Sequence, residues 1–249
     1  MTTEPTADVA EGGWRQRYPE DPASRRRKAA NIVRVLRRSG DLTGLRLCEV
    51  GAGSGHMSSV FMEAVGDRGT VISTDVVDTR REDPGNDFRL IEGDSLPLES
   101  ESVDLVVSNH VIEHVGQRAD QLRHLTEIRR VLVPGGRAYL STPNRWAPVE
   151  NHFKLPFLGW LPPSQRDRYV RLARRGDVFD VVPLSPADLD RLCAEAGLVA
   201  EDVTSQVVDG IVEAAPGAAS SKVLSRVPVH RARAVSRAMP TQVRLCRRP

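Results

Sequence analysis

Cysteine is scarce in this chain of 249 residues, and the few cysteines stand far apart. Cys48, Cys193 and Cys246 have apolar neighbours and show no Cys-x-x-Cys spacing. Disulfide frameworks and zinc sites need paired or closely spaced cysteines, so neither is expected. We predict that the cysteines are buried thiols and that none is a nucleophile.

Long apolar runs are also missing. No apolar stretch reaches the roughly 18 residues that a membrane-spanning helix needs. The first residues contain acids and prolines where a signal peptide would have an apolar stretch. The sequence therefore predicts a cytoplasmic protein without a transmembrane segment.

A glycine-rich turn is present, but it lacks the marks of two common nucleotide-binding loops. Residues 49–55 read Glu-Val-Gly-Ala-Gly-Ser-Gly, and no Gly-Lys-Ser/Thr follows, which argues against a P-loop. A dinucleotide fingerprint usually has its third glycine where this chain has His56. Glycines at alternate positions still allow a sharp turn and the close approach of a ligand to a helix N-terminus. We predict a ligand site between a strand at 45–50 and a helix that begins near His56.

Polar side chains follow the next predicted strands at their carboxyl ends. These strands are expected at 71–75, at 88–95 with Asp94 at its end, and at 103–108 followed by Asn109. Ligands of open α/β sheets bind at this edge, so Glu49, Asp75, Asp94 and Asn109 should converge on one crevice. Asp75 lies about 20 residues beyond the glycines, where an acid can reach ribose hydroxyls.

Ordered motifs between residues 45 and 144 resemble the class I S-adenosylmethionine-dependent methyltransferases, particularly the small-molecule branch that includes the ubiquinone-pathway enzymes. They occupy 49–55, Asp75, 92–98 (Glu-Gly-Asp-Ser-Leu-Pro-Leu), 102–114 and 132–144. The resemblance implies an α/β fold that is Rossmann-like and doubly wound, with a mostly parallel seven-stranded sheet, flanking helices and an inserted cap.

The resemblance also implies the cofactor, S-adenosylmethionine, and its site. The glycines would line the methionine part, Asp75 would bind the ribose, Asp94 and Ser95 would face the adenine, and Asn109 would close the site. The complete predicted cofactor site is Glu49, Gly51, Ala52, Gly53, Gly55, Asp75, Val76, Asp94, Ser95 and Asn109. Acidic strand ends suit this cationic cofactor better than the diphosphate of NAD, which they would repel.

Histidines beside the fourth predicted strand are candidates for the catalytic base. Transfer to oxygen or nitrogen needs alignment of the acceptor and, for many acceptors, removal of a proton. We predict His114 or His110 for this role, since both would lie on one face if the segment is helical. His152 is a more distant choice.

The spacing His110-x-x-Glu113-His114 resembles the Glu-x-x-Glu-His metal set of some ubiquinone-pathway and small-RNA methyltransferases. His110 replaces the first glutamate of that set, so no metal is included in the predicted site.

The rest of the chain is expected to elaborate a single domain at 23–249, after an irregular segment at 1–22. A helix at 23–39 with a basic outer face should pack beside the cofactor edge. Prolines and aromatic residues at about 145–183 predict a substrate cap, with a satellite core or a homodimer contact as the alternative. A helix to about residue 196, a strand at 199–207 and a last strand at 242–246 should complete the sheet.

The predicted function is methyl transfer from S-adenosylmethionine to an oxygen or nitrogen of a small-molecule acceptor. The tail from residue 214 is basic and contains no acid, so it can attract RNA or another anionic surface, although no DNA binding is expected. One alternative is therefore an RNA 2′-O-methyltransferase. The other is a catalytically silent module that uses the cofactor fold to bind a partner.

Overall fold

The computed structural model describes residues 21–214 and 239–249, and all statements below concern these ranges. The predicted irregular segment at 1–22 lies almost entirely outside them. So does most of the basic tail, at 215–238.

The described residues form a seven-stranded sheet in the order β3-β2-β1-β4-β5-β7-β6. The strands are β1 (Arg46–Val50), β2 (Thr70–Asp75), β3 (Asp87–Leu90), β4 (Val103–Asn109), β5 (Leu132–Pro143), β6 (Val199–Asp202) and β7 (Thr241–Arg247). β1 pairs in parallel with both β2 and β4, so the strand order reverses beside β1. Among these strands, β7 is antiparallel to both of its neighbours, β5 and β6, and all other pairs are parallel. The predicted fold class is confirmed.

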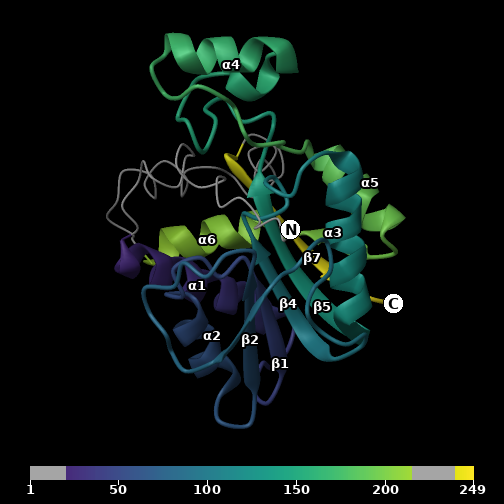
Figure 1. The fold of residues 1–249 in the computed structure, drawn as a ribbon. Helices are drawn as coiled ribbons and strands as arrows, with labels where there is room; N and C mark the ends of the chain where they lie inside the picture. The colour runs from purple at the N-terminus through teal and green to yellow at the C-terminus, as the bar shows by residue number, and fades with distance from the viewer. Residues whose placement is uncertain (1–20, 215–238) are drawn as a thin grey trace, which may run out of the picture.

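Helices cover both faces of the sheet, as Figure 1 shows. One face carries α1 (Pro22–Arg38), α2 (Ser58–Val65) and α6 (Thr204–Ala214), and the other carries α3 (Arg118–Val131) and α5 (Pro186–Glu195). Asp21 begins α1 by accepting the backbone N–H groups of Ala23 and Ser24. The predicted helix at 23–39 is confirmed within a residue at each end.

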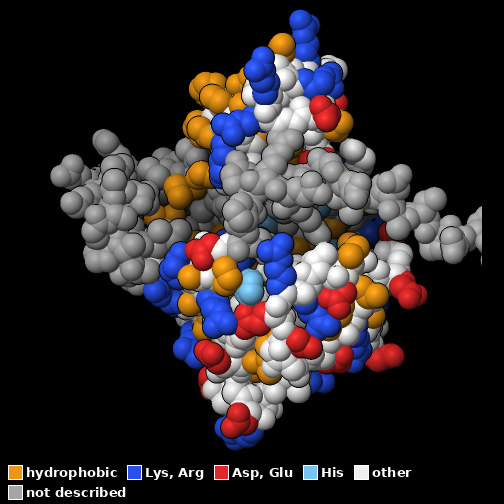
Figure 2. Space-filling view, turned by 60° about the vertical axis from the view of Figure 1, so that its left-hand side comes forward, with side chains coloured by type: hydrophobic (Ala, Val, Ile, Leu, Met, Phe, Trp, Pro, Cys, Tyr) orange, Lys and Arg blue, Asp and Glu red, His pale blue; other side chains and the backbone are white. Residues whose placement is uncertain are grey.

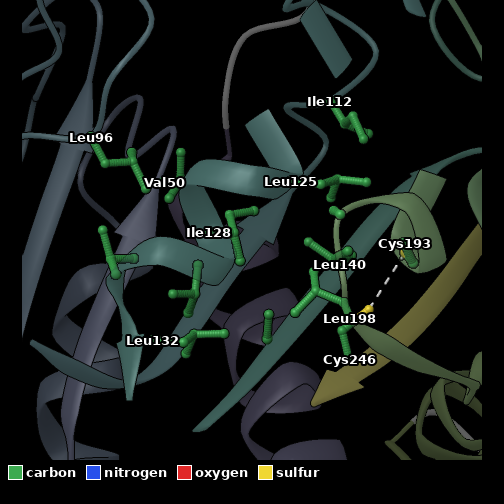
Figure 3. Packing of buried hydrophobic residues seen from close by; sticks show 14 of the residues in the cluster. Val50, Leu96, Ile112, Leu125, Ile128, Leu132, Leu140, Cys193, Leu198 and Cys246 are labelled. Atoms are coloured by element: carbon green, nitrogen blue, oxygen red, sulfur yellow. Dashed lines mark hydrogen bonds between the residues drawn. The ribbon is translucent and has the colours of Figure 1, made fainter. Parts of the chain in front are cut away.

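Two apolar cores hold these layers together. One contains Ile32 of α1, Phe61 of α2 and Leu47 of β1. The other joins α3 and α5 to the opposite sheet face through residues such as Ile128 and Leu140 (Figure 3). Cys193 and Cys246 lie in this second core with their sulfurs 3.7 Å apart. All three cysteines are free and buried, as predicted.

Residues 145–183 form the inserted cap, which leaves the sheet after β5 and returns before α5. The cap contains a short 3-10 helix, η2 (Leu158–Trp160), and α4 (Pro163–Leu172), which stands above the sheet edge in Figure 1. Its ends lie side by side, because Asn144 and Leu184 form a parallel bridge. The cap has a small core of its own, made of Phe153, Leu155, Leu158 and Val170.

Two predicted elements are wrong in extent. The strand expected at 199–207 ends at Asp202, because the Asp202 carboxylate accepts the Thr204 N–H and begins α6. The strand expected at 88–95 ends at Leu90, because β3 is an edge strand and its only neighbour, β2, ends opposite at Asp75. Asp94 therefore lies in the loop beyond the strand.

No described helix is both long enough and apolar enough to cross a bilayer.

Candidate functional site

The glycine-rich turn follows β1 and is held by the end of β2. The N–H groups of Gly51 and Ala52 donate to the Thr74 carbonyl, and the Gly53 N–H donates to Asp75 Oδ2 over 2.8 Å. Asp75 Oδ1 also accepts its own neighbour's N–H, from Val76. A carboxylate offers about four lone-pair sites, so Asp75 can fix the turn and still accept hydroxyl groups.

The three glycines of the turn serve different purposes. All have positive φ, a region that side chains disfavour. A Cβ on Gly51 would lie 2.5 Å from Val111 Cγ2, and one on Gly55 would lie 2.3 Å from the Glu82 carbonyl oxygen. A Cβ on Gly53 would meet no atom within 4 Å. Gly51 and Gly55 thus permit close packing, while Gly53 leaves open space that a ligand can approach.

The loop after β2 folds against the glycine-rich turn. The N–H groups of Arg81 and Glu82 both donate to the Ser54 carbonyl. The Glu82 carboxylate lies 2.6 Å from His56 Nδ1 and accepts a hydrogen bond from Arg26 of α1. These contacts place α1 beside the predicted cofactor edge. Glu82 was not anticipated from sequence, since no local spacing relates it to His56.

Glu49 faces the interior of the sheet and its helix layer. Its carboxylate is buried and accepts hydrogen bonds from Ser58 Oγ over 2.5 Å and from Ser73 Oγ over 3.0 Å. Burial raises the pKa of Glu49 to about 7. In this arrangement Glu49 joins β1 to α2 and β2.

The predicted adenine-facing residues lie on the surface. The Asp94 carboxylate pairs with Arg123 of α3, and Ser95 is exposed. Asn109 ends β4 beside the turn, and its Oδ1 accepts a hydrogen bond from Ser141 Oγ. Val76 is exposed and Ala52 is buried.

A cluster of three histidines surrounds a buried carboxylate just after β4. Glu113 Oε1 lies 3.0 Å from His110 Nδ1, 3.7 Å from His152 Nε2 and 4.0 Å from His114 Nε2. Its Oε2 accepts a hydrogen bond from Thr142 of β5. Residues 111–115 form a turn rather than a helix, so this turn, and not helical spacing, brings His110 and His114 to the same carboxylate.

Burial and hydrogen bonding favour an ionised Glu113 beside a neutral His110. Burial would raise the pKa of Glu113, but the hydrogen bond from His110 and the neighbouring imidazoles lower it below its usual value. Burial lowers the pKa of His110. An ionised Glu113 can only accept a hydrogen bond, so the proton of neutral His110 lies on Nδ1 and Nε2 is its basic nitrogen.

The cap contributes to this cluster through a second carboxylate. Glu150 is buried and lies 3.0 Å from His152 Nδ1, and it also accepts the backbone N–H groups of His152 and Phe153. This fixes the ring of His152 with Nε2 toward Glu113. Glu150 has no sequence signal that links it to this cluster, because only the fold of the cap brings it to the β4 edge.

The donor set is also suited to a metal. His110, Glu113 and His152 each offer a ligand atom, and these atoms lie within 4.8 Å of one another. Imidazole with one carboxylate suits divalent transition metals better than magnesium or calcium. The geometry selects His152 as the third ligand, whereas the sequence spacing had suggested His114.

Comparison with known proteins identifies the class. Residues 48–140 match the family described as "Methyltransferase domain", which spans β1 to β5 and includes the glycine-rich turn. Together with the fold, this shows that the chain is a class I S-adenosylmethionine-dependent methyltransferase, an enzyme whose cofactor is S-adenosylmethionine.

Two curated relatives match this chain over about two thirds of both lengths. The demethylmenaquinone methyltransferase of Lactococcus lactis is 29% identical over 68% of this chain and 71% of its own length. The ubiquinone biosynthesis O-methyltransferase of Cereibacter sphaeroides is 29% identical over 64% of this chain and 68% of its own. An S-adenosylmethionine-dependent methyltransferase from Mesorhizobium loti has the same fold, with a TM-score of 0.60, 18% identity and coverage of 89% of this chain and 98% of that one.

Proposed function

We propose that this enzyme transfers the methyl group to an oxygen or nitrogen of a small molecule held between the β4 edge and the cap. The observation that carries this proposal is the cluster of His110, His114 and His152 around Glu113. An imidazole in this cluster is suited to accept the proton that a hydroxyl or amine acceptor loses. The relative from Cereibacter sphaeroides, which is named an O-methyltransferase, supports transfer to oxygen.

The open side of the glycine-rich turn fits the cofactor. We propose that Gly53 and the remaining acceptor sites of Asp75 hold it, with Ala52, Val76 and Asn109 beside them, and that Asp94 and Ser95 lie at its outer end. Bound there, S-adenosylmethionine supplies an activated methyl group at its sulfonium centre. Gly51 and Gly55 let the backbone turn sharply beside the cofactor, and Glu49 supports the strand beneath the turn.

The chain's own residues then align the acceptor and take its proton. The contact between the Gly51 position and Val111 places the residues after β4 next to the glycine-rich turn. His114 or His110 receives the proton, and the charge of Glu113 stabilises the imidazolium that forms. The cap at 145–183 covers the acceptor within a single domain at 23–249. A homodimer and a cytoplasmic location stay predictions.

The test combines a histidine variant with metal removal. We expect His114→Ala to bind S-adenosylmethionine normally but to lower kcat by about 10²–10⁴-fold, because general base catalysis is lost. The matched control is His124→Ala, since the burial that lowers the pKa of His124 to about 4 leaves its ring a poor base. Turnover is followed as release of S-adenosylhomocysteine in an acceptor screen, and the methylated atom is located by NMR.

Metal removal separates two ways of activating the acceptor. We expect protein stripped with a chelator to keep its activity, because histidine alone accepts the proton. Loss of activity that zinc or manganese restores would instead assign the step to a metal held by His110, Glu113 and His152. A methyl group found on carbon would contradict the proposed acceptor.

A further inference from the structure

We propose that the outer surface of the cap binds the surface of an anionic lipid bilayer. The surface, here called the cap face, consists of Trp146, Val149, Phe157 and Trp160. These large apolar side chains are 48%, 46%, 50% and 48% exposed. Four such residues gathered on one small unit form an apolar patch of the kind that marks a binding surface.

The cap face is held together by the backbone beneath it. The Phe157 N–H donates to the Pro148 carbonyl over 2.7 Å, and Val149 forms an antiparallel bridge with Pro156. The guanidinium of Arg145 donates to the Gly159 carbonyl. Segments 145–149 and 156–160 are therefore side by side, and their exposed side chains form one pre-arranged surface.

The exposed aromatic rings are not part of the cap's own core. The cap already buries Phe153, Leu155, Leu158 and Val170 in its own core. Phe157 has a φ of 55°, a left-handed conformation that bulky residues rarely adopt. Leu158, the next residue, is fully buried, while Phe157 stays outside and packs on Trp160 with ring centroids 4.7 Å apart. Strained backbone of this kind often accompanies a functional surface.

Charge on the cap selects the occupant. Residues 145–183 contain seven Lys and Arg but four Asp and Glu, and one of each, Arg166 and Glu150, is buried. The exposed arginines are Arg168, Arg171, Arg174 and Arg175. Figure 2 shows hydrophobic and basic side chains together on the part of the molecule that α4 forms. Tryptophan beside arginine is the composition of surfaces that insert at the headgroup level of anionic bilayers.

The cap face lies on the same insertion as the catalytic cluster. Glu150 and His152 reach Glu113 from the segment that also carries Val149 and Trp160. A bilayer bound to the cap face would therefore lie next to the proposed acceptor site. Binding of the cap face to a bilayer does not depend on which atom of the acceptor is methylated.

Vesicle sedimentation with the full chain tests the proposal. We expect the protein to sediment with phosphatidylcholine vesicles that contain phosphatidylglycerol, and not with phosphatidylcholine alone. The double substitution Phe157→Ala and Trp160→Ala should weaken this partition at least tenfold. The control is Val199→Ala, a more exposed apolar residue on β6 away from the cap, which should leave partition unchanged.

A charge variant keeps the test decisive if the aromatic variant folds poorly. Arg171→Glu on α4 replaces an exposed side chain that donates only to the Asp177 carbonyl in the described structure, and it should also weaken binding to the anionic vesicles, as should added salt. Unchanged binding in both cap variants would overturn the proposal, since another basic surface would then be responsible. Absence of vesicle binding by the wild type would overturn the proposal as well. It would also be overturned if the cap variants kept vesicle binding but lost RNA binding or lost dimerisation measured by sedimentation velocity.

Discussion

At the scale of single residues, burial decides what Glu49 does. It occupies a strand end where sequence analysis placed a cofactor ligand, yet its side chain turns inward to Ser58 and Ser73. Its pKa of about 7 exceeds the ordinary value of 4.5, so the folded state favours the protonated form. The contribution of Glu49 to stability is therefore complete below about pH 4.5 and is lost as the pH rises through about 7.

We predict that Glu49→Gln removes this pH dependence. The shift corresponds to about 3 kcal/mol between the two limits. The variant should keep nearly the same free energy of unfolding at about pH 5 and about pH 8, while the wild type loses stability over that interval. Urea denaturation at both pH values measures the difference. An equal change in the free energy of unfolding between the two pH values in both proteins would show that Glu49 is ionised throughout.

Asp75 holds the glycine-rich turn and, as proposed, also binds the cofactor. Asp75→Ala should weaken S-adenosylmethionine binding by about 1–3 kcal/mol, because hydroxyl contacts are lost, and should cost stability because the Gly53 N–H loses its acceptor. Isothermal titration and thermal unfolding measure the two effects. Asp87→Ala serves as the control, because Asp87 lies at the end of β3 that is far from Asp75. This variant should change neither cofactor affinity nor stability. Unaltered affinity in the Asp75 variant would remove this residue from the cofactor site.

At the scale of elements, the glycine-rich turn has one face that packs and one that is open. Gly55→Ala would place a methyl group against the Glu82 carbonyl in a left-handed conformation. It should lower stability by more than the roughly 1–2 kcal/mol of conformational cost alone. Gly53→Ala meets no atom and should cost only about that amount, yet lower cofactor affinity roughly tenfold, which is about 1.4 kcal/mol. Paired melting and titration experiments distinguish them, and equal melting losses would contradict the assignment.

Elements could be predicted from sequence where local pattern decides. The strands that became β1, β2, β4 and β7 and the helix α1 follow from apolar runs and capping residues. The end of β3 could not be predicted, because it depends on where its neighbour β2 stops. The turn after β4 was equally hidden, since the left-handed His110 directs the chain away from a helix.

At the scale of the whole molecule, cofactor binding is coupled to folding. A ligand that binds only the folded state stabilises it by about 2.7 kcal/mol at a hundredfold excess over Kd. For a chain of this size we expect the melting temperature to rise by about 5–10 °C with S-adenosylmethionine and not with NADH. Differential scanning fluorimetry measures both shifts. A larger shift with NADH would contradict the assigned cofactor.

Contacts between distant segments decide which basic residues near the C-terminus are free to bind an anion. Among the basic residues near the C-terminus, Arg244 is buried between Asp190 and Asp202, and Arg248 pairs with Glu101. These arginines stabilise the sheet and its helices. They are not available to bind RNA, although the arginines at 226–237 lie outside the described residues.

The sequence by itself determined the class of the protein, because the strand endings, the glycine spacing and the acidic Asp75 are local patterns that need no knowledge of distant contacts. Tertiary structure alone decided which polar groups work together. The Glu113 cluster needs His152 and Glu150 from the cap, and Glu49 is turned inward by serines on α2 and β2. The physical reason is that hydrogen bonds and burial act between neighbours in space, and chain folding brings together residues whose sequence spacing carries no signal.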